Sequence, residues 1–188
     1  MDCKMIRINL STPICLLEIT SCTNGLHTIK RIEQSFNQKI YHLNDTENID
    51  NKSYPKSLIQ AFNWFRQYFD NNYGQPDLDL YDLMKNNKLL CRKIQLTNFK
   101  RKTYLELLKN IQYGQCSSYS ELSKMVINNN HSARAIGTVM KNNPLIIMIP
   151  CHRIIKKSGI IGKYAGEEDP MKRWLIEHEK TTTIKPRK

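Results

Sequence analysis

The sequence predicts an α/β protein: a small N-terminal domain of antiparallel sheet plus helix, then a mainly helical, winged-helix-like C-terminal domain. Three short apolar runs separated by turn residues near the N-terminus predict the sheet. Two neighbouring capped helices in the second half predict a helix-turn-helix. We expect the domains at residues 1–92 and 93–180, followed by a basic tail at 181–188. With 188 residues, 40% of them apolar, the chain can bury a core.

The N-terminal domain begins with three expected strands joined by short turns, which predicts an antiparallel meander. The strands are expected at residues 5–10, 15–20 and 26–31. Residues 35–56 are polar and predict a long loop, and 72–96 predict a linker. Between them, 56–71 predict an amphipathic helix with an aromatic stripe at Phe62, Phe65 and Phe69. Such a stripe can stack on bases, but core packing is the commoner role.

The second half predicts short helices. The first is expected at 98–111, and the next begins at Ser118, which forms a capping box with Glu121. After a turn, Ser132 is placed to cap a helix that runs to about residue 142 and is stopped by Asn143-Pro144. The apolar run 145–149 follows, and a last helix is expected at 171–180. Helix pairs occur in any helical domain, so the helix-turn-helix signal is weak by itself.

Charge is concentrated in the second half of a chain with net charge +12. Residues 97–188 hold 17 Lys and Arg against 7 Asp and Glu, whereas residues 1–96 hold 12 against 10. A basic half indicates a polyanionic partner such as nucleic acid, although lysine-rich proteomes also produce basic proteins without one.

No apolar run approaches the length of a membrane span, and the N-terminus has no signal-peptide pattern, so we expect an intracellular protein without membrane partners. Six cysteines are too few for a disulfide scaffold of this size, which leaves free thiols, metal ligands or nucleophiles. We expect Cys116 in the core. The expected location is the nucleus in a eukaryote and otherwise the cytoplasm.

Cys151 ends an apolar run and is followed by His152 and Arg153. A buried cysteine often serves only as a small apolar side chain. A reactive cysteine needs its thiolate favoured by a base or by positive charge, and these two neighbours could provide either. The residues alone leave both interpretations open.

The segment Ile149-Pro150-Cys151-His152-Arg153-Ile154-Ile155 resembles the active-site signature of the O6-alkylguanine-DNA alkyltransferases. Its context follows in order. Arg134-Ala135-Ile136-Gly137 with Asn142-Asn143-Pro144 resembles the recognition helix and asparagine hinge, 162–166 resembles the loop over the base, and 174–179 resembles the last helix. The resemblance covers residues 97–180, and residues 3–30 resemble the N-terminal domain of the animal enzymes.

The resemblance implies direct repair of O6-alkylguanine, in which Cys151 attacks the alkyl carbon, keeps the group and is spent after one turnover. His152 would be the base, acting through a bridging water, and Glu179 would orient it. Tyr119 would help the guanine leave, and Asn143 would link the helix-turn-helix to the site. No organic cofactor is implied. The rival hypothesis is a DNA-binding module in which Cys151 is merely buried.

The same resemblance implies a monomer that flips the damaged base out of duplex DNA. Arg134 would fill the vacated space, and small side chains on its helix would permit close approach to the minor groove. The expected DNA contacts are Tyr119, Ser120, Ala133, Arg134, Gly137, Lys141 and Lys157. The expected pocket residues are Met140, Tyr164, Ala165 and Gly166. Ala165 stands where relatives often carry Ser, so only its backbone N–H could contact O6.

A structural zinc site is expected at one end of the sheet. In an antiparallel meander, Cys3, Cys22 and His27 fall at the same end, and all three are Zn²⁺ ligands by type. Animal relatives take a fourth ligand, a His, from the linker before the second domain. Residues 72–96 contain no His, and Cys91 lies near the matching position. The alternative is three unrelated side chains.

Overall fold

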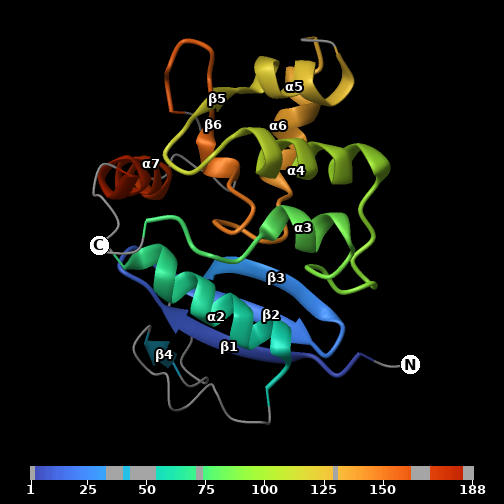
Figure 1. Ribbon diagram of the computed structural model, residues 1–188, viewed down its shortest axis with the longest axis vertical. Helices are drawn as coiled ribbons and strands as arrows, with labels where there is room; N and C mark the ends of the chain where they lie inside the picture. The colour runs from blue at the N-terminus through green and yellow to red at the C-terminus, as the bar shows by residue number, and fades with distance from the viewer. Residues whose placement is uncertain are drawn as a thin grey trace. The chain divides into compact units, whose positions relative to one another are not determined.

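The computed structural model describes residues 3–32, 40–42, 54–70, 74–128, 131–161 and 170–183. The chain divides into two compact units, Met1–Gln95 and Leu96–Lys188. Figure 1 shows the first as a sheet with helices and the second as mainly helical. The predicted α/β class is confirmed.

The N-terminal unit contains a four-stranded sheet in the order β3-β2-β1-β4. β1 (Ile6–Ser11), β2 (Leu16–Cys22) and β3 (Gly25–Ile32) form the expected antiparallel meander. β4 (Ile40–His42) pairs with β1 in parallel, so the sheet is mixed, where an antiparallel one was expected. Three residues are too few to show the alternation that identifies a strand in sequence, and 35–56 therefore suggested only a loop.

α2 (Lys56–Phe69) packs on β2 and β3 and lies across one face of the sheet (Figure 1). Its aromatic residues belong to the core: Phe62 and Phe65 are almost fully buried, and Trp64 stacks on Tyr68 with ring centroids 4.9 Å apart. Ser57 at the start of the helix hydrogen-bonds the Ser21 hydroxyl of β2 at 2.7 Å. The stripe therefore anchors the helix to the sheet and is not a base-stacking platform.

Residues 74–95 are more ordered than the expected linker. They contain α3 (Leu80–Lys85), which Asp79 caps by accepting from the Asp82 N–H. After α3 the chain runs against the start of β3, where Leu26 N–H donates to Leu89 O and Cys91 N–H donates to Leu26 O. A six-residue helix is too short to give a clear apolar period. The polar residues on both sides of it therefore led to the prediction of a linker.

The C-terminal unit is built on α4 (Asn98–Asn110), which packs against both helices of the helix-turn-helix, α5 (Tyr119–Ile127) and α6 (Ala133–Lys141). The other described elements are β5 (Ser117–Ser118), η1 (Cys151–Arg153), β6 (Ile154–Ile155) and α7 (Pro170–Thr183). β5 and β6 pair in parallel.

Of the two predicted N-terminal caps in the helix-turn-helix, the structure shows the cap of α5 and no side-chain cap bond for α6. The capping box between Ser118 and Glu121 is confirmed, and Asn128 ends α5 in the left-handed conformation. Ser132 holds the N-cap position of α6 but makes no side-chain cap bond. Its ψ of 21° departs from the extended backbone that aims a capping hydroxyl at the helix N–H groups.

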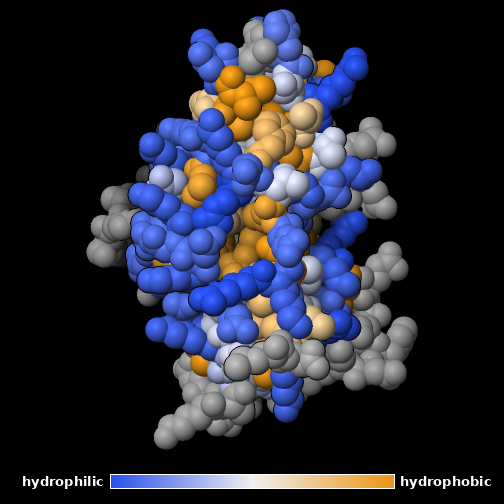
Figure 2. Space-filling model, turned by 90° about the vertical axis from the view of Figure 1, so that its right-hand side faces the viewer, coloured by the Kyte–Doolittle hydropathy of each residue, from blue (hydrophilic) through white to orange (hydrophobic). Residues whose placement is uncertain are grey.

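Hydrophilic residues cover much of the face seen in Figure 2, with hydrophobic residues between them. Exposed large apolar side chains of the C-terminal unit are Met125, Ile127 and Ile160. Cys116 is also exposed, which corrects the expectation that it lies in the core. Among the described helices, none combines the length and apolarity that crossing a membrane requires.

Gly25→Ala is expected to destabilise the N-terminal unit. Gly25 has φ +134°, and a Cβ there would lie 2.7 Å from Cys91 N and 2.8 Å from Leu90 C. Backbone strain and overpacking against main chain together should lower the free energy of unfolding by about 3 kcal/mol. Urea unfolding followed by circular dichroism measures this.

Gly159→Ala is the matched control. Gly159 also has positive φ, +79°, but no atom of the described residues lies within 4 Å of its Cβ position. Strain alone should cost about 1 kcal/mol there. Equal losses in the two variants would contradict the role of close packing at Gly25.

Candidate active site and metal cluster

Cys151 stands at the end of two tight turns formed by the apolar run 145–149 and Pro150. Met148 N–H donates to Ile146 O and Cys151 N–H donates to Ile149 O, each spanning two residues. The first turn holds Ile147 at φ +72°, a conformation that β-branched residues rarely adopt. The second uses Pro150, whose φ of −81° suits it. These turns place Cys151, with its buried sulfur, at the first position of η1.

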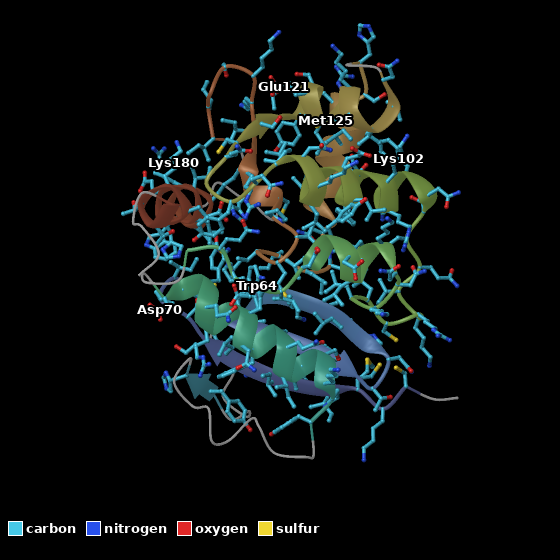
Figure 3. All side chains as sticks on the ribbon, in the orientation of Figure 1. Trp64, Asp70, Lys102, Glu121, Met125 and Lys180 are labelled. Carbon is cyan, nitrogen blue, oxygen red and sulfur yellow. The ribbon has the colours of Figure 1, made fainter. Side chains whose placement is uncertain are left out.

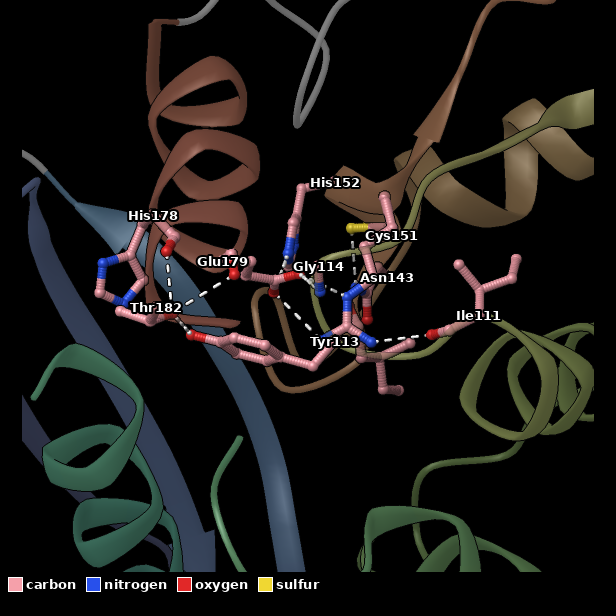
Figure 4. A network of polar contacts seen from close by, with 11 residues as sticks. Ile111, Tyr113, Gly114, Asn143, Cys151, His152, His178, Glu179 and Thr182 are labelled. Atoms are coloured by element: carbon pink, nitrogen blue, oxygen red, sulfur yellow. Dashed lines mark hydrogen bonds and ion pairs between the residues drawn. The ribbon is translucent and has the colours of Figure 1, made fainter. Parts of the chain in front are cut away.

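Asn143 ties the end of α6 to the nucleophile. Its Nδ2 donates to Cys151 Sγ at 3.0 Å (Figure 4) and to Ile149 O at 2.8 Å. Its Oδ1 accepts from Leu145 N–H at 2.9 Å. One side chain therefore fixes both ends of the turn region and aims a donor at the sulfur. A donor to sulfur favours the thiolate form over the thiol.

His152 and Glu179 form a buried pair behind the nucleophile. His152 Nε2 lies 2.7 Å from Glu179 Oε1, and both side chains are almost without solvent. Burial lowers the pKa of His152, although the Glu179 charge opposes the shift. The imidazole is therefore neutral and donates Nε2–H to the carboxylate, which leaves Nδ1 as its basic nitrogen.

Glu179 accepts from two further groups. Arg153 donates through Nε at 2.9 Å and through Nη2 at 3.1 Å, and Gly114 N–H donates at 3.1 Å (Figure 4). Burial alone would raise the pKa of Glu179, but the charge of Arg153 and the hydrogen bonds from His152 and Arg153 outweigh it and hold that pKa well below its usual range. The carboxylate is ionised throughout the neutral pH range.

The residues alone left open whether a base or positive charge from His152 or Arg153 favours the thiolate, and the structure argues against positive charge. His152 is neutral, and Arg153 directs its guanidinium at Glu179 and, through Nη1, at Ile111 O. Sequence spacing could not show this because the partners lie 26 and 42 residues from Arg153.

Lys172 is a further residue that sequence analysis missed. It is 1% exposed, donates Nζ–H to Ile154 O at 2.6 Å, and lies with Nζ 5.8 Å from the centre of the Tyr119 ring. Burial lowers the pKa of Lys172, whereas charge on Cys151 raises it. Burial, and then charge on Cys151, raise the pKa of Tyr119. The signal of Lys172 in the sequence was its place on the apolar side of α7, between Met171 and Leu175.

The expected DNA-contacting residues are accessible on the C-terminal unit. Arg134, Lys141 and Lys157 are exposed, and Tyr119, Ser120, Ala133 and Gly137 are partly exposed. Figure 3 shows the neighbouring Glu121 and Met125 on α5. Within the described part of the chain, a Cβ at Gly137 would meet only Tyr119, at an ordinary 3.9 Å, so packing against these residues does not require glycine there.

The expected pocket residues divide into two groups. Met140 is buried at the end of α6. Tyr164, Ala165 and Gly166 lie outside the described residues.

A second cluster lies in the N-terminal unit, where the structure brings together Cys3, Cys22, His27 and Cys91 with all four ligand atoms within 4.8 Å of one another. Sulfur–sulfur separations are 3.5 Å and 3.6 Å from Cys91 to Cys22 and Cys3, and His27 Nε2 lies 3.2–3.3 Å from the same two sulfurs. Tetrahedral Zn²⁺ with bonds of about 2.3 Å to sulfur requires edges of about 3.8 Å. The cluster could hold a metal ion.

Comparison with known proteins identifies the family. The model of the 6-O-methylguanine DNA methyltransferase DNA-binding domain matches residues 98–181. The methylated-DNA–protein-cysteine methyltransferase of Cricetulus griseus is 32% identical over 187 residues, covering 98% of this chain and 86% of its own. The Homo sapiens protein of that name is 32% identical over 189 residues, covering 98% and 85%.

Solved structures agree. The Mycobacterium tuberculosis O6-methylguanine methyltransferase superimposes with TM-score 0.68 at 24% identity, covering 95% of this chain and 94% of that one, which shows the shared fold. The M. tuberculosis OGT in complex with DNA gives TM-score 0.68 at 25% identity, covering 94% and 93%. The near-complete coverage by relatives above 30% identity shows that this chain belongs to the methylated-DNA–protein-cysteine methyltransferase family.

Proposed function

We propose that the protein repairs O6-alkylguanine in duplex DNA by transferring the alkyl group irreversibly to Cys151, once per molecule. The observation that carries this is the environment of Cys151 Sγ, which has an amide donor from Asn143 at 3.0 Å and is followed in the chain by His152, whose ring pairs with buried Glu179. A cysteine that served only as core packing would need neither a directed donor nor a base.

The nucleophile is activated in two ways. Neutral His152 takes the thiol proton on Nδ1 through a bridging water, and the Glu179 carboxylate stabilises the resulting imidazolium. The Asn143 amide stabilises the thiolate. The sulfur then attacks the alkyl carbon, so that an S–C bond forms as the C–O6 bond breaks and its electron pair leaves with the guanine.

Tyr119 and Lys172 serve the departing base. The raised pKa of Tyr119 keeps its hydroxyl protonated at neutral pH, so it can donate a hydrogen bond to the guanine as charge develops there. The Lys172 ammonium near the Tyr119 ring supplies positive charge to the same region.

The helix-turn-helix is the element that binds the DNA. Flipping the damaged nucleotide costs a few kcal/mol, which Arg134 offsets by occupying the vacated stack. Ala133 and Gly137 let α6 approach the minor groove closely, since no close contact with the residues that the structure describes explains the glycine. Lys141 and Lys157 pair with phosphates.

The N-terminal cluster holds a structural Zn²⁺ in this proposal. Cys3, Cys22, His27 and Cys91 supply three thiolates and one imidazole, a ligand set typical of structural zinc. The metal would join the segment before β1, the end of β2, the start of β3 and the segment after α3.

Cys151→Ala tests the transfer. Wild-type protein incubated with a duplex carrying one O6-methylguanine should gain one methyl group on Cys151, saturating at one per chain, as measured by intact mass and peptide mapping. Cys151→Ala should gain none, while Cys116→Ala, which removes an exposed thiol, should react normally. Tight binding of the duplex by the wild type without a mass change would overturn the proposal in favour of a lesion-binding module.

Glu179→Gln is expected to cost about 3–5 kcal/mol of stability at pH 7, because it leaves the Arg153 charge buried without compensation, and to slow methyl transfer at least tenfold. The folded pKa of Glu179 lies below its unfolded value of about 4.3. The stability it contributes is therefore fully present above that pH and is lost as the pH falls through the folded pKa. Urea unfolding at several pH values measures the difference between variant and wild type.

Glu177→Gln on the same helix is the control, since Glu177 is exposed and its loss should change stability by no more than about 0.5 kcal/mol. A difference between wild type and Glu179→Gln that stayed constant down to pH 2 would contradict the ionised buried carboxylate.

The zinc proposal predicts one Zn²⁺ per purified chain, measured by elemental analysis, with a chelator lowering the melting temperature. Cys91→Ser should bind zinc more weakly and melt lower. Cys15→Ser should keep the metal, since Cys15 lies beside Thr12 and outside the cluster. A folded wild-type protein that contains no metal and is insensitive to zinc would refute the site.

A further inference from the structure

Tyr104 is a buried polar residue to which the proposed function gives no role. It lies on α4 with no exposed surface, and its hydroxyl donates to Val139 O at 3.0 Å, with Asn142 O also within reach at 3.3 Å. Both acceptors belong to the end of α6. The single hydroxyl proton is thus shared between the last turn of α6 and the residue that follows it.

The end of α6 needs this donor because its own hydrogen bonding changes there. In a continuing helix, Val139 O would accept from the N–H four residues later, that of Asn143. Asn143 N–H instead donates to Met140 O at 3.3 Å, which tightens the last turn. The Tyr104 hydroxyl supplies the donor that Val139 O lacks within α6, and it holds the peptide between Asn142 and Asn143.

That peptide leads directly to the group that touches the nucleophile. Asn143 follows Asn142 in the chain, and its Nδ2 donates to Cys151 Sγ. We infer that Tyr104 is a positioning residue for alkyl transfer, whose hydroxyl fixes the end of α6 and thereby the Asn143 amide on Cys151 Sγ. The inference rests on the proposed function.

The hydroxyl remains a donor at the pH of the reaction. Burial, together with the charge that Cys151 can carry, raises the pKa of Tyr104. The other titratable groups near Cys151 in the described part of the unit are Tyr119 of α5, Lys172 of α7 and, next in the chain, His152. Tyr104 itself hydrogen-bonds the turn that carries Asn143.

Tyr104→Phe removes the hydroxyl and keeps the ring. Two rates are measured against pH: methyl transfer from an O6-methylguanine duplex, and carbamidomethylation of Cys151 by iodoacetamide, quantified by peptide mapping. A loosened Asn143 amide should slow methyl transfer about tenfold and raise the pH midpoint of Cys151 carbamidomethylation by about half a unit. Affinity for undamaged duplex should stay within about twofold of wild type, because Tyr104 is buried.

Thr103→Val is the matched control. It removes the neighbouring buried hydroxyl of α4, which donates only to Phe99 O within the same helix, and should leave the pH midpoint unchanged. Melting temperatures are measured for both variants. In an Asn143→Ala background, Tyr104→Phe should produce no further shift of the midpoint.

The outcomes separate the alternatives. A Tyr104→Phe variant with lower stability but an unchanged pH midpoint would make the hydroxyl merely structural and overturn the inference. A variant that stays unfolded even at 10 °C with saturating duplex, while Thr103→Val folds, would do the same. If the wild type fails to accept a methyl group, the proposed function fails, while the iodoacetamide profiles still test the Tyr104–Asn143–Cys151 link.

Discussion

The carboxylate of Glu179 lies almost out of reach of solvent and accepts hydrogen bonds from the His152 ring, from two nitrogens of Arg153 and from the Gly114 backbone. The site around Cys151 depends on this arrangement. A buried carboxylate is tolerated only when charge and hydrogen bonds replace the water it has lost. Each donor is therefore confined to one position, and η1, the segment after α4 and α7 are joined at one point.

This constraint also assigns the chemical roles. Because Arg153 is occupied by Glu179, it holds the site together and does not act on the sulfur. The thiolate is favoured instead by the Asn143 amide, while the neutral imidazole of His152 can accept a proton at Nδ1. The charged residues support the base, and an uncharged amide supports the nucleophile.

The segment Asn142-Asn143-Pro144 connects α6 to the turns that lead to Cys151. On one side, α6 carries exposed Arg134 and the small residues Ala133 and Gly137, and on the other, the Asn143 amide donates to Cys151 Sγ. We infer that a change in the backbone at the end of α6 shifts the donor to Cys151 Sγ, because the Asn143 side chain joins the two. The buried hydroxyl of Tyr104 at that helix end fits this coupling.

The sequence by itself determined the features that depend on local order along the chain. Periodicity located α2 and α4, spacing located the capping box of α5, strand order placed Cys3, Cys22 and His27 at one sheet end, and a contiguous motif identified Cys151 and His152. Tertiary structure decided what depends on contacts between distant residues. The pairing of Arg153 with Glu179, the bond from Tyr104 to Val139 and the turn at Ile147 leave no periodic trace, because each is set by how packed elements meet. Short elements such as β4 and α3 escaped prediction since neighbouring strands and backbone contacts, more than their own few residues, hold them in place.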